Sequence, residues 1–178
     1  LKKTLDIQQQ TALQLLQAGY RVRGTVRSLD KAARVAASLR AAGQTDLAAL
    51  ECIEADLLAD AGWDDAVTGC DYVIHTASPF PASVPKDENE LIRPAREGTL
   101  RVLRAAQRAG VQRVVLTSSI AAIVYGEGHS PYSERDWTDL NSPQTTPYYK
   151  SKTLAEQDAW AFARDSGLSL AVINPGLI

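Results

Sequence analysis

Hydrophobic and polar positions along the chain follow two periods in turn, one typical of strands and one typical of helices. Short runs that are rich in β-branched residues and bounded by glycine, proline or polar clusters predict strands. Five such runs occur, at residues 20–26, 50–55, 71–77, 111–116 and 168–173. The run at 71–77 is almost continuously apolar, which predicts a buried strand.

Segments with apolar residues three or four positions apart lie between these runs and predict helices. The longest covers residues 89–109 and ends at Gly110. The other predicted helices are residues 31–42, capped by Asp30 and Gly43, residues 59–67, and residues 148–164, capped by Gly167. Because strand and helix alternate, the sequence predicts an α/β fold with a Rossmann-type, doubly wound parallel sheet, whose ligands bind beyond the carboxyl ends of the strands.

The first 18 residues depart from that order, since they predict a helix that ends at Gly19. The apolar residues of one face of this helix are Leu5, Ile7, Leu13 and Leu16. A doubly wound nucleotide-binding domain begins instead with a strand and a glycine-rich turn that cradles phosphate. The 11 glycines form no G-x-x-G-x-x-G or G-x-G-x-x-G motif. We therefore expect residues 1–178 to be an incomplete nucleotide-binding domain of the Rossmann type that lacks the first strand and the glycine loop.

The composition is that of an ordinary globular domain, with 45% hydrophobic, 22% charged and 6% aromatic residues. The net charge is −2, so the chain lacks the excess of basic residues that nucleic-acid binders have, and we expect no nucleic-acid partner. No run of apolar residues approaches the ~18 residues of a membrane helix, so we expect no membrane partner and a cytoplasmic location. Cys52 and Cys70 have no metal-ligand spacing and are expected to be buried thiols. The absence of methionine predicts that the chain is part of a longer translation product.

Tyr148 and Lys152 form the most informative candidate for chemistry. Residues four apart on a helix share one face, so the phenol and the ammonium group are expected to lie close together. A neighbouring cation stabilises the phenolate, which helps the phenol to exchange a proton with an alcohol or carbonyl oxygen. The alternative for this pair in isolation is an interfacial tyrosine beside a solvated lysine.

Thr117, Ser118 and Ser119 stand at the end of the predicted strand 111–116, about 30 residues before the tyrosine. A hydroxyl at this end of the sheet can reach the same substrate oxygen as the Tyr148 phenol. Serines at strand ends also cap helices and bond turns, so Ser119 alone remains open between the two roles.

Several motifs in order resemble one known family, over Leu13 to Ile178. They are residues 18–28 (AGYRVRGTVRS), 71–79 (DYVIHTASP), 113–119 (RVVLTSS), 148–156 (YYKSKTLAE) and 174–176 (NPG). The chain resembles the extended short-chain dehydrogenase/reductases of the NAD-dependent epimerase/dehydratase superfamily. Within them it is most similar to the branch of dihydroflavonol reductases, cinnamoyl-CoA reductases and bacterial aldehyde or ketone reductases.

The resemblance implies a catalytic set of Ser119, Tyr148 and Lys152. Ser119 and Tyr148 would hydrogen-bond the substrate carbonyl, Tyr148 would donate the proton, and Lys152 would assist it while holding the nicotinamide ribose. His75 and His129 offer no catalytic geometry, and His75 fits the family's strand end.

The resemblance also implies NADP as the cofactor, because Arg27 stands where NAD-dependent relatives have an acidic residue, and a guanidinium suits a 2′-phosphate. Lys31, or else Arg34, would join it, although both can equally be solvated helix charges. The implied cofactor-binding residues are Arg27, Lys31, Asp56, Leu57, Thr76, Ala77, Ser78, Thr117, Tyr148, Lys152 and Pro175. Asp56 and Leu57 would contact the adenine.

Two departures from the family pattern accompany these matches. Relatives continue beyond Asn174-Pro-Gly into a substrate-binding region, which is missing here. Glu97 also replaces an asparagine common at that point, which would disturb a hydrogen bond behind the active site.

The favoured hypothesis is an NADP-dependent reductase that converts a small-molecule aldehyde or ketone to an alcohol. A nucleotide-sugar epimerase or dehydratase with the same triad is the second, and the Val26-Arg27 pair argues against it. A non-catalytic dinucleotide-binding or interaction module is the third. The resemblance to the family is compatible with a homodimer. Residues 1–178 alone are expected to be inactive, because the glycine-rich loop that cradles the phosphates is missing.

Overall fold

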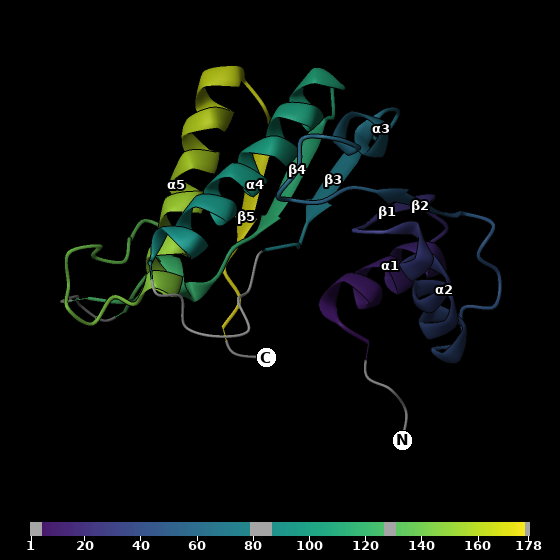
Figure 1. Cartoon of the computed structure of the whole chain (residues 1–178), viewed down its shortest axis with the longest axis horizontal. Helices are drawn as coiled ribbons and strands as arrows, with labels where there is room; N and C mark the ends of the chain where they lie inside the picture. Colours follow the sequence, from purple (N-terminus) through teal and green to yellow (C-terminus); the bar gives the residue numbers. More distant parts are fainter. Residues whose placement is uncertain (1–4, 79–86, 127–130, 177–178) are drawn as a thin grey trace. The chain divides into compact units, whose positions relative to one another are not determined.

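The computed structural model describes residues 5–78, 87–126 and 131–176. The chain divides into two compact units, Leu1–Thr68 and Gly69–Ile178. Each unit contains one parallel β-sheet with helices (Figure 1). The α/β order and the parallel pairing predicted from the sequence are therefore confirmed.

The first unit is built around a two-stranded parallel sheet. Its elements are α1 (Ile7–Gln17), β1 (Val22–Val26), the 3-10 helix η1 (Leu29–Lys31), α2 (Ala32–Ala41), β2 (Leu50–Glu54) and α3 (Trp63–Val67). β1 pairs with β2 in a register from Val22 opposite Leu50 to Val26 opposite Glu54. Leu13 and Leu16 of α1 and Leu39 of α2 form a buried hydrophobic cluster in this unit.

The start of the first unit differs in detail from the sequence prediction. α1 begins at Ile7, because the Asp6 side chain accepts a hydrogen bond from Gln9 N at 2.8 Å and so caps the helix there. Ile7 is exposed rather than part of the apolar face. Asp30 does not cap α2 but lies within η1, where its carboxylate accepts from the Ser28 hydroxyl. From residue 5 onward, no described strand precedes α1.

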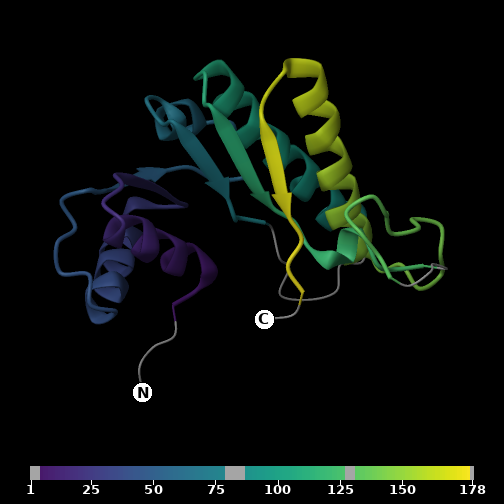
Figure 2. The ribbon, with the colours of Figure 1, turned by 180° about the vertical axis from the view of Figure 1, so that it is seen from behind.

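The second unit is built around a three-stranded parallel sheet with β4 in the centre, in the order β3-β4-β5. Its elements are β3 (Tyr72–His75), α4 (Asn89–Arg108), β4 (Arg113–Thr117), the 3-10 helix η2 (Ile120–Ala122), α5 (Pro147–Ser166) and β5 (Leu170–Ile173). α4 and α5 lie side by side against one face of this sheet, while the other face is turned to the viewer in the reverse view (Figure 2).

The prediction of a buried strand at 71–77 is wrong for alternate residues of β3. His75 is only 4% exposed, but Tyr72 is 60% and Ile74 42% exposed. Successive side chains of a strand point to opposite faces, and α4 and α5 cover one face only. Ile173 of β5, at 54% exposure, lies on the same open side of the sheet.

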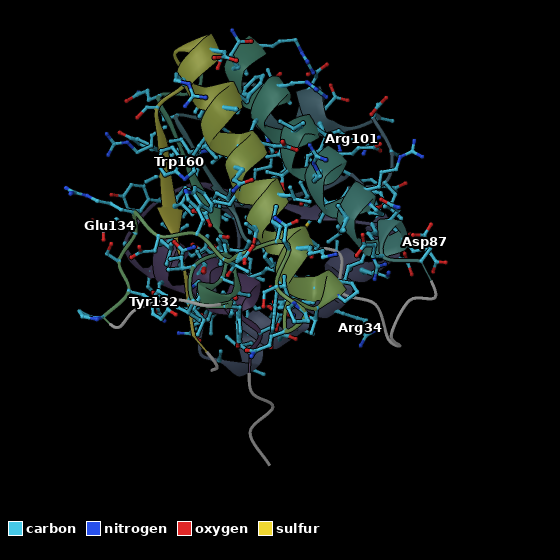
Figure 3. All side chains as sticks on the ribbon, turned by 90° about the vertical axis from the view of Figure 1, so that its left-hand side faces the viewer. Arg34, Asp87, Arg101, Tyr132, Glu134 and Trp160 are labelled. Atoms are coloured by element: carbon cyan, nitrogen blue, oxygen red, sulfur yellow. The ribbon has the colours of Figure 1, made fainter. Side chains whose placement is uncertain are left out.

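α4 and α5 are joined by a two-pronged ion pair between Arg96 and Asp158. The guanidinium donates from Nε to Oδ2 at 2.6 Å and from Nη2 to Oδ1 at 3.0 Å. Figure 3 shows the two helices with their side chains, with Trp160 on the α5 side and Arg101 on the α4 side. This bidentate geometry restrains how the two helices lie against each other.

Candidate active site

The start of α5 places Tyr148 in the first turn of the helix. The Thr146 hydroxyl oxygen accepts a hydrogen bond from Tyr149 N at 3.3 Å, and Pro147 occupies the first helical position, where no N–H is needed. These two residues define where the helix begins. The place of Tyr148 in the first turn is therefore set by a local sequence signal.

Lys152 lies one turn further along α5, on the same face as Tyr148. Its ammonium nitrogen is 5.7 Å from the centre of the Tyr148 ring. Burial lowers the pKa of the Lys152 ammonium group, because the charged form loses hydration. In such a low-dielectric place its positive charge acts more strongly on a neighbouring anion than it would in water.

Ser119 follows β4 and caps η2, which packs against α5. Its Oγ accepts a hydrogen bond from Ala121 N at 3.1 Å. Since that contact uses the oxygen as an acceptor, the hydroxyl proton remains available for donation to a ligand. The predicted serine therefore stands beside the helix that carries Tyr148 and Lys152.

The ends of β4 and β5 continue to pair beyond the strands themselves. Ser118 N donates to Ile173 O at 2.8 Å, and Ile120 N donates to Pro175 O at 3.0 Å. The Asn174 side chain donates from Nδ2 to Ser119 O at 3.1 Å and to Glu156 Oε2 at 2.7 Å.

Sequence reasoning gave Glu156 and Asn174 no role of their own. A signal for Glu156 was present, since it stands four residues after Lys152 and so shares its helical face.

One pocket of the second unit brings together several predicted cofactor-binding residues. Ala77 and Ser78 after β3, Thr117 at the end of β4 and Lys152 on α5 all line it. Thr99, Leu116, Ser118, Ala155 and Glu156 complete its walls. Thr76 directly follows β3, and Pro175 follows β5 by two residues, but neither lines this pocket. The pocket thus offers hydroxyl groups and one ammonium group at the carboxyl ends of the strands.

His75 is the last residue of β3 and lies close to this pocket. Its Nε2 is buried and has no hydrogen-bond partner within the described residues. Burial, together with the positive charge of Lys152, lowers the pKa of His75 to about 4. The imidazole is therefore neutral near pH 7. His129 lies outside the described residues.

The first unit carries the residues predicted for the adenosine end of the cofactor. Arg27 directly follows β1, and Asp56 follows β2 by two residues. Because the strands are parallel and Ala55 N donates to Val26 O at 2.9 Å, both residues lie at the same edge of this sheet. Arg27 is exposed and forms no ion pair with any described residue. Lys31 ends η1, and Arg34 is exposed on α2 (Figure 3).

The loop after β2 has a defined conformation. Asp56 Oδ1 accepts from Leu58 N at 3.0 Å, and Asp56 O accepts from the Trp63 indole at 3.1 Å. Leu57 is half-buried between them. Gly62 caps α3 with φ +85°, and a Cβ atom at this position would overlap the Glu54 carbonyl oxygen. Only glycine fits this close approach.

Three further expectations concern individual side chains and segments. The Glu97 carboxylate forms ion pairs with Arg93 Nε at 3.0 Å and with Arg101 Nη2 at 3.5 Å. The hydrogen bond from Arg93, together with the charges of both arginines, lowers the pKa of the Glu97 carboxyl. Cys52 and Cys70 are partly exposed, not buried as predicted. Within the described ranges, no group of three or more potential ligands could hold a metal ion, and no helix is long and apolar enough to cross a membrane.

The chain belongs to the NAD dependent epimerase/dehydratase family, whose model matches residues 9–178. Its relatives include anthocyanidin, dihydroflavonol and cinnamoyl-CoA reductases, which confirms the resemblance to the extended short-chain dehydrogenase/reductases stated from the motifs. Anthocyanidin reductase of Vitis vinifera is 36% identical over 173 residues, 92% of this chain and 50% of that protein. Dihydroflavonol 4-reductase of Zea mays is 38% identical, over 93% of this chain and 48% of that protein. The chain thus spans about half the length of these curated relatives.

Solved structures agree on the fold. Yeast methylglyoxal/isovaleraldehyde reductase, complexed with NADPH, matches with a TM-score of 0.77 and 30% identity over 95% of this chain and 54% of that one. A UDP-N-acetylglucosamine 4-epimerase of Bacillus cereus, 16% identical, matches with a TM-score of 0.66 over 90% of this chain and 52% of that one, and supports the fold alone. The Rossmann-type expectation is confirmed by these matches.

Proposed function

We propose that residues 1–178 form the dinucleotide-binding and catalytic part of an NADP-dependent oxidoreductase that reduces a small aldehyde or ketone to an alcohol. The observation that carries the proposal is the Lys152 ammonium group 5.7 Å from the Tyr148 ring, on the helix that packs against the Ser119 cap. The two curated relatives and the yeast protein described above are reductases, which supports the same class of reaction.

The hydroxyl and ammonium groups that line the pocket suit parts of a dinucleotide. Ser78, Thr117 and Lys152 offer hydroxyl groups and one cation, which suit ribose hydroxyls and phosphate oxygens. In the first unit, the exposed Arg27 guanidinium suits a 2′-phosphate. In this proposal Lys31, at the end of η1, adds a second positive charge for that phosphate, and Asp56 and Leu57, after β2, contact the adenine. When bound, NADPH supplies the hydride for the carbonyl carbon.

The chain's own residues handle the oxygen of the carbonyl. Ser119, whose Oγ already accepts from Ala121 N, donates its proton in a hydrogen bond to that oxygen. Tyr148 donates the proton that completes the alcohol, and the Lys152 charge stabilises the phenolate left behind. Neutral His75 adds no second positive charge near Lys152.

A nucleotide-sugar epimerase would use the same Ser119, Tyr148 and Lys152. Arg27 favours the reductase, because a reductase that takes a fresh NADPH in each cycle benefits from a specific contact to the 2′-phosphate.

The test is NADPH oxidation by the full natural protein in the presence of aromatic and aliphatic aldehydes and ketones. Turnover that is lost in Tyr148→Phe, with NADPH binding retained, is the expected result. NADPH binding without turnover of any carbonyl compound would favour a binding module, and reduction of tightly bound NADP by a nucleotide sugar would favour an epimerase or dehydratase.

A further inference from the structure

The Asn174 amide joins three elements of the second unit through one nitrogen atom. Its two N–H groups donate to Ser119 O, after β4, and to Glu156 Oε2, on α5, while Asn174 itself follows β5. Both protons of the amide nitrogen are therefore committed to different parts of the site.

The Glu156 side chain is well placed to accept the hydrogen bond from Asn174. It is 5% exposed, and its second oxygen accepts from the Trp160 indole N–H at 3.3 Å. An ionised carboxylate accepts hydrogen bonds and donates none, so Asn174 and Trp160 are matched partners for it. Burial of a carboxylate without hydrogen-bond donors would cost free energy, so the Glu156 side chain favours the conformation in which both donors reach it.

The spacing along α5 links Glu156 to the catalytic pair. Glu156 lies four residues after Lys152, which lies four residues after Tyr148, so the three share one helical face. Glu156 and Lys152 both line the same pocket. A restraint on Glu156 therefore restrains the helix face that presents Tyr148 and Lys152.

The second hydrogen bond from Asn174 restrains Ser119. Ser119 is held by its carbonyl oxygen through Asn174 and by its Oγ through Ala121 N. The direct hydrogen bonds from Asn174 thus connect the strand end that carries Ser119 to the helix that carries Tyr148.

We propose that Glu156 and Asn174 form a clasp that sets the separation between Ser119 and the Tyr148–Lys152 pair. Glu156 and Asn174 are positioning residues in this role, because the clasp acts through the groups that it holds. The inference rests on the proposed function for its kinetic consequence, but its mechanical part concerns the chain alone.

The first variant is Asn174→Leu, which keeps the side-chain volume and removes both donors. We expect amide hydrogen exchange to rise at residues 118–122 and in the first turn of α5. In the full natural protein, kcat should fall by about ten- to hundred-fold, as expected for a displaced catalytic group, while the Kd for NADPH changes little. Asn141→Leu, at an exposed loop position, is the matched control and should change neither quantity.

The second variant, Asn174→Asp, gives a readout that a merely structural role would not move. Its carboxylate would face the Glu156 carboxylate and the Ser119 carbonyl oxygen, and these acceptors repel one another until the carboxyl pair takes up a proton. Lys152 on α5 lines the same pocket as Glu156, and its charge also acts on His75 at the end of β3. The activity of Asn174→Asp relative to the wild type should therefore rise as the pH is lowered.

The outcomes separate the clasp from the proposed function. Unchanged hydrogen exchange at 118–122 in Asn174→Leu, or a pH profile of Asn174→Asp parallel to the wild type, would overturn the clasp. A wild-type protein that oxidises no NADPH would overturn the proposed function, and the clasp would then be decided by hydrogen exchange alone. Far-ultraviolet circular dichroism of each variant ensures that a lost fold is recognised as such.

Discussion

The Lys152 ammonium nitrogen lies 5.7 Å from the centre of the Tyr148 ring, within the range of a cation–π contact. The two residues are four apart on α5, and the start of this helix is fixed by the Thr146 cap and by Pro147. Their proximity thus follows from local structure, and it makes the phenol the group on which the proposed chemistry depends.

Replacing Tyr148 by phenylalanine should lower turnover in the full natural protein by about 100-fold or more, because only the proton donor is lost. NADPH affinity and the unfolding midpoint should stay close to those of the wild type. Steady-state kinetics and a binding titration measure both. Tyr149→Phe is the matched control, since Tyr149 also loses a hydroxyl but stacks on Tyr125 with ring centroids 3.6 Å apart. Equal losses in the two variants would contradict the role of Tyr148.

Replacing Arg27 by alanine should weaken NADPH binding far more than NADH binding. A charge-assisted contact to the 2′-phosphate contributes roughly 1.5 to 3 kcal/mol, or about 10- to 150-fold in Kd, and NADH lacks that phosphate. Calorimetric titration with both dinucleotides gives the two ratios. Arg21→Ala, at the opposite end of β1, serves as the control. If both cofactors lose affinity equally, Arg27 does not read the 2′-phosphate.

The buried His75 should make the chain less stable in acid. Its folded-state pKa of about 4 lies below the unfolded value of about 6.5, so between these pH values the unfolded chain binds a proton that the folded chain does not. The free energy of unfolding should therefore fall as the pH falls through this window, by about 2 kcal/mol from neutrality to roughly pH 5. Urea denaturation across this pH range measures the slope.

His75→Gln should reduce this slope, since glutamine does not titrate. His129→Gln, which removes the other histidine of the chain, is the comparison. Parallel pH dependences of the wild type and the His75→Gln variant would show that the pKa of His75 is the same in the folded and the unfolded chain.

Replacing Gly62 by alanine should destabilise the first unit by more than about 2 kcal/mol. The residue has φ +85°, and the added Cβ would overlap the Glu54 carbonyl oxygen, so the new side chain meets both backbone strain and a clash with backbone. Gly43→Ala separates the two effects, because Gly43 has φ +100° but a Cβ added there would meet no atom within 4 Å. It should cost only about 1 kcal/mol. Equal unfolding midpoints for the two variants would argue against the close approach at Gly62.

Local signals account for what the sequence predicted well. The observed α4 and α5 begin and end within two residues of the predicted helices, because apolar spacing and the following glycines act within a few residues. Gly110 and Gly167 both have positive φ after the last helical turn. The same logic predicted the shared face of Tyr148 and Lys152.

Features that depend on distant partners were not predictable in the same way. α3 begins at Trp63 rather than near residue 59, since Gly62 turns the chain where it approaches the Glu54 carbonyl at the end of β2. The exposure of Ile74 depends on which face of the sheet α4 and α5 cover. The contact between Glu156 and Asn174 joins a helix to a strand end, and no periodicity in the sequence encodes such a pairing.

The open face of the β3-β4-β5 sheet also affects the heat capacity of unfolding. Tyr72, Ile74 and Ile173 are already hydrated in the folded state, so unfolding transfers less new apolar surface to water than in a domain that covers both faces of its sheet. Since apolar hydration dominates the heat-capacity change, these side chains lower its value per residue slightly, toward the lower end of the typical range of about 12–15 cal/mol/K. The curve of stability against temperature should accordingly be slightly flatter for this chain.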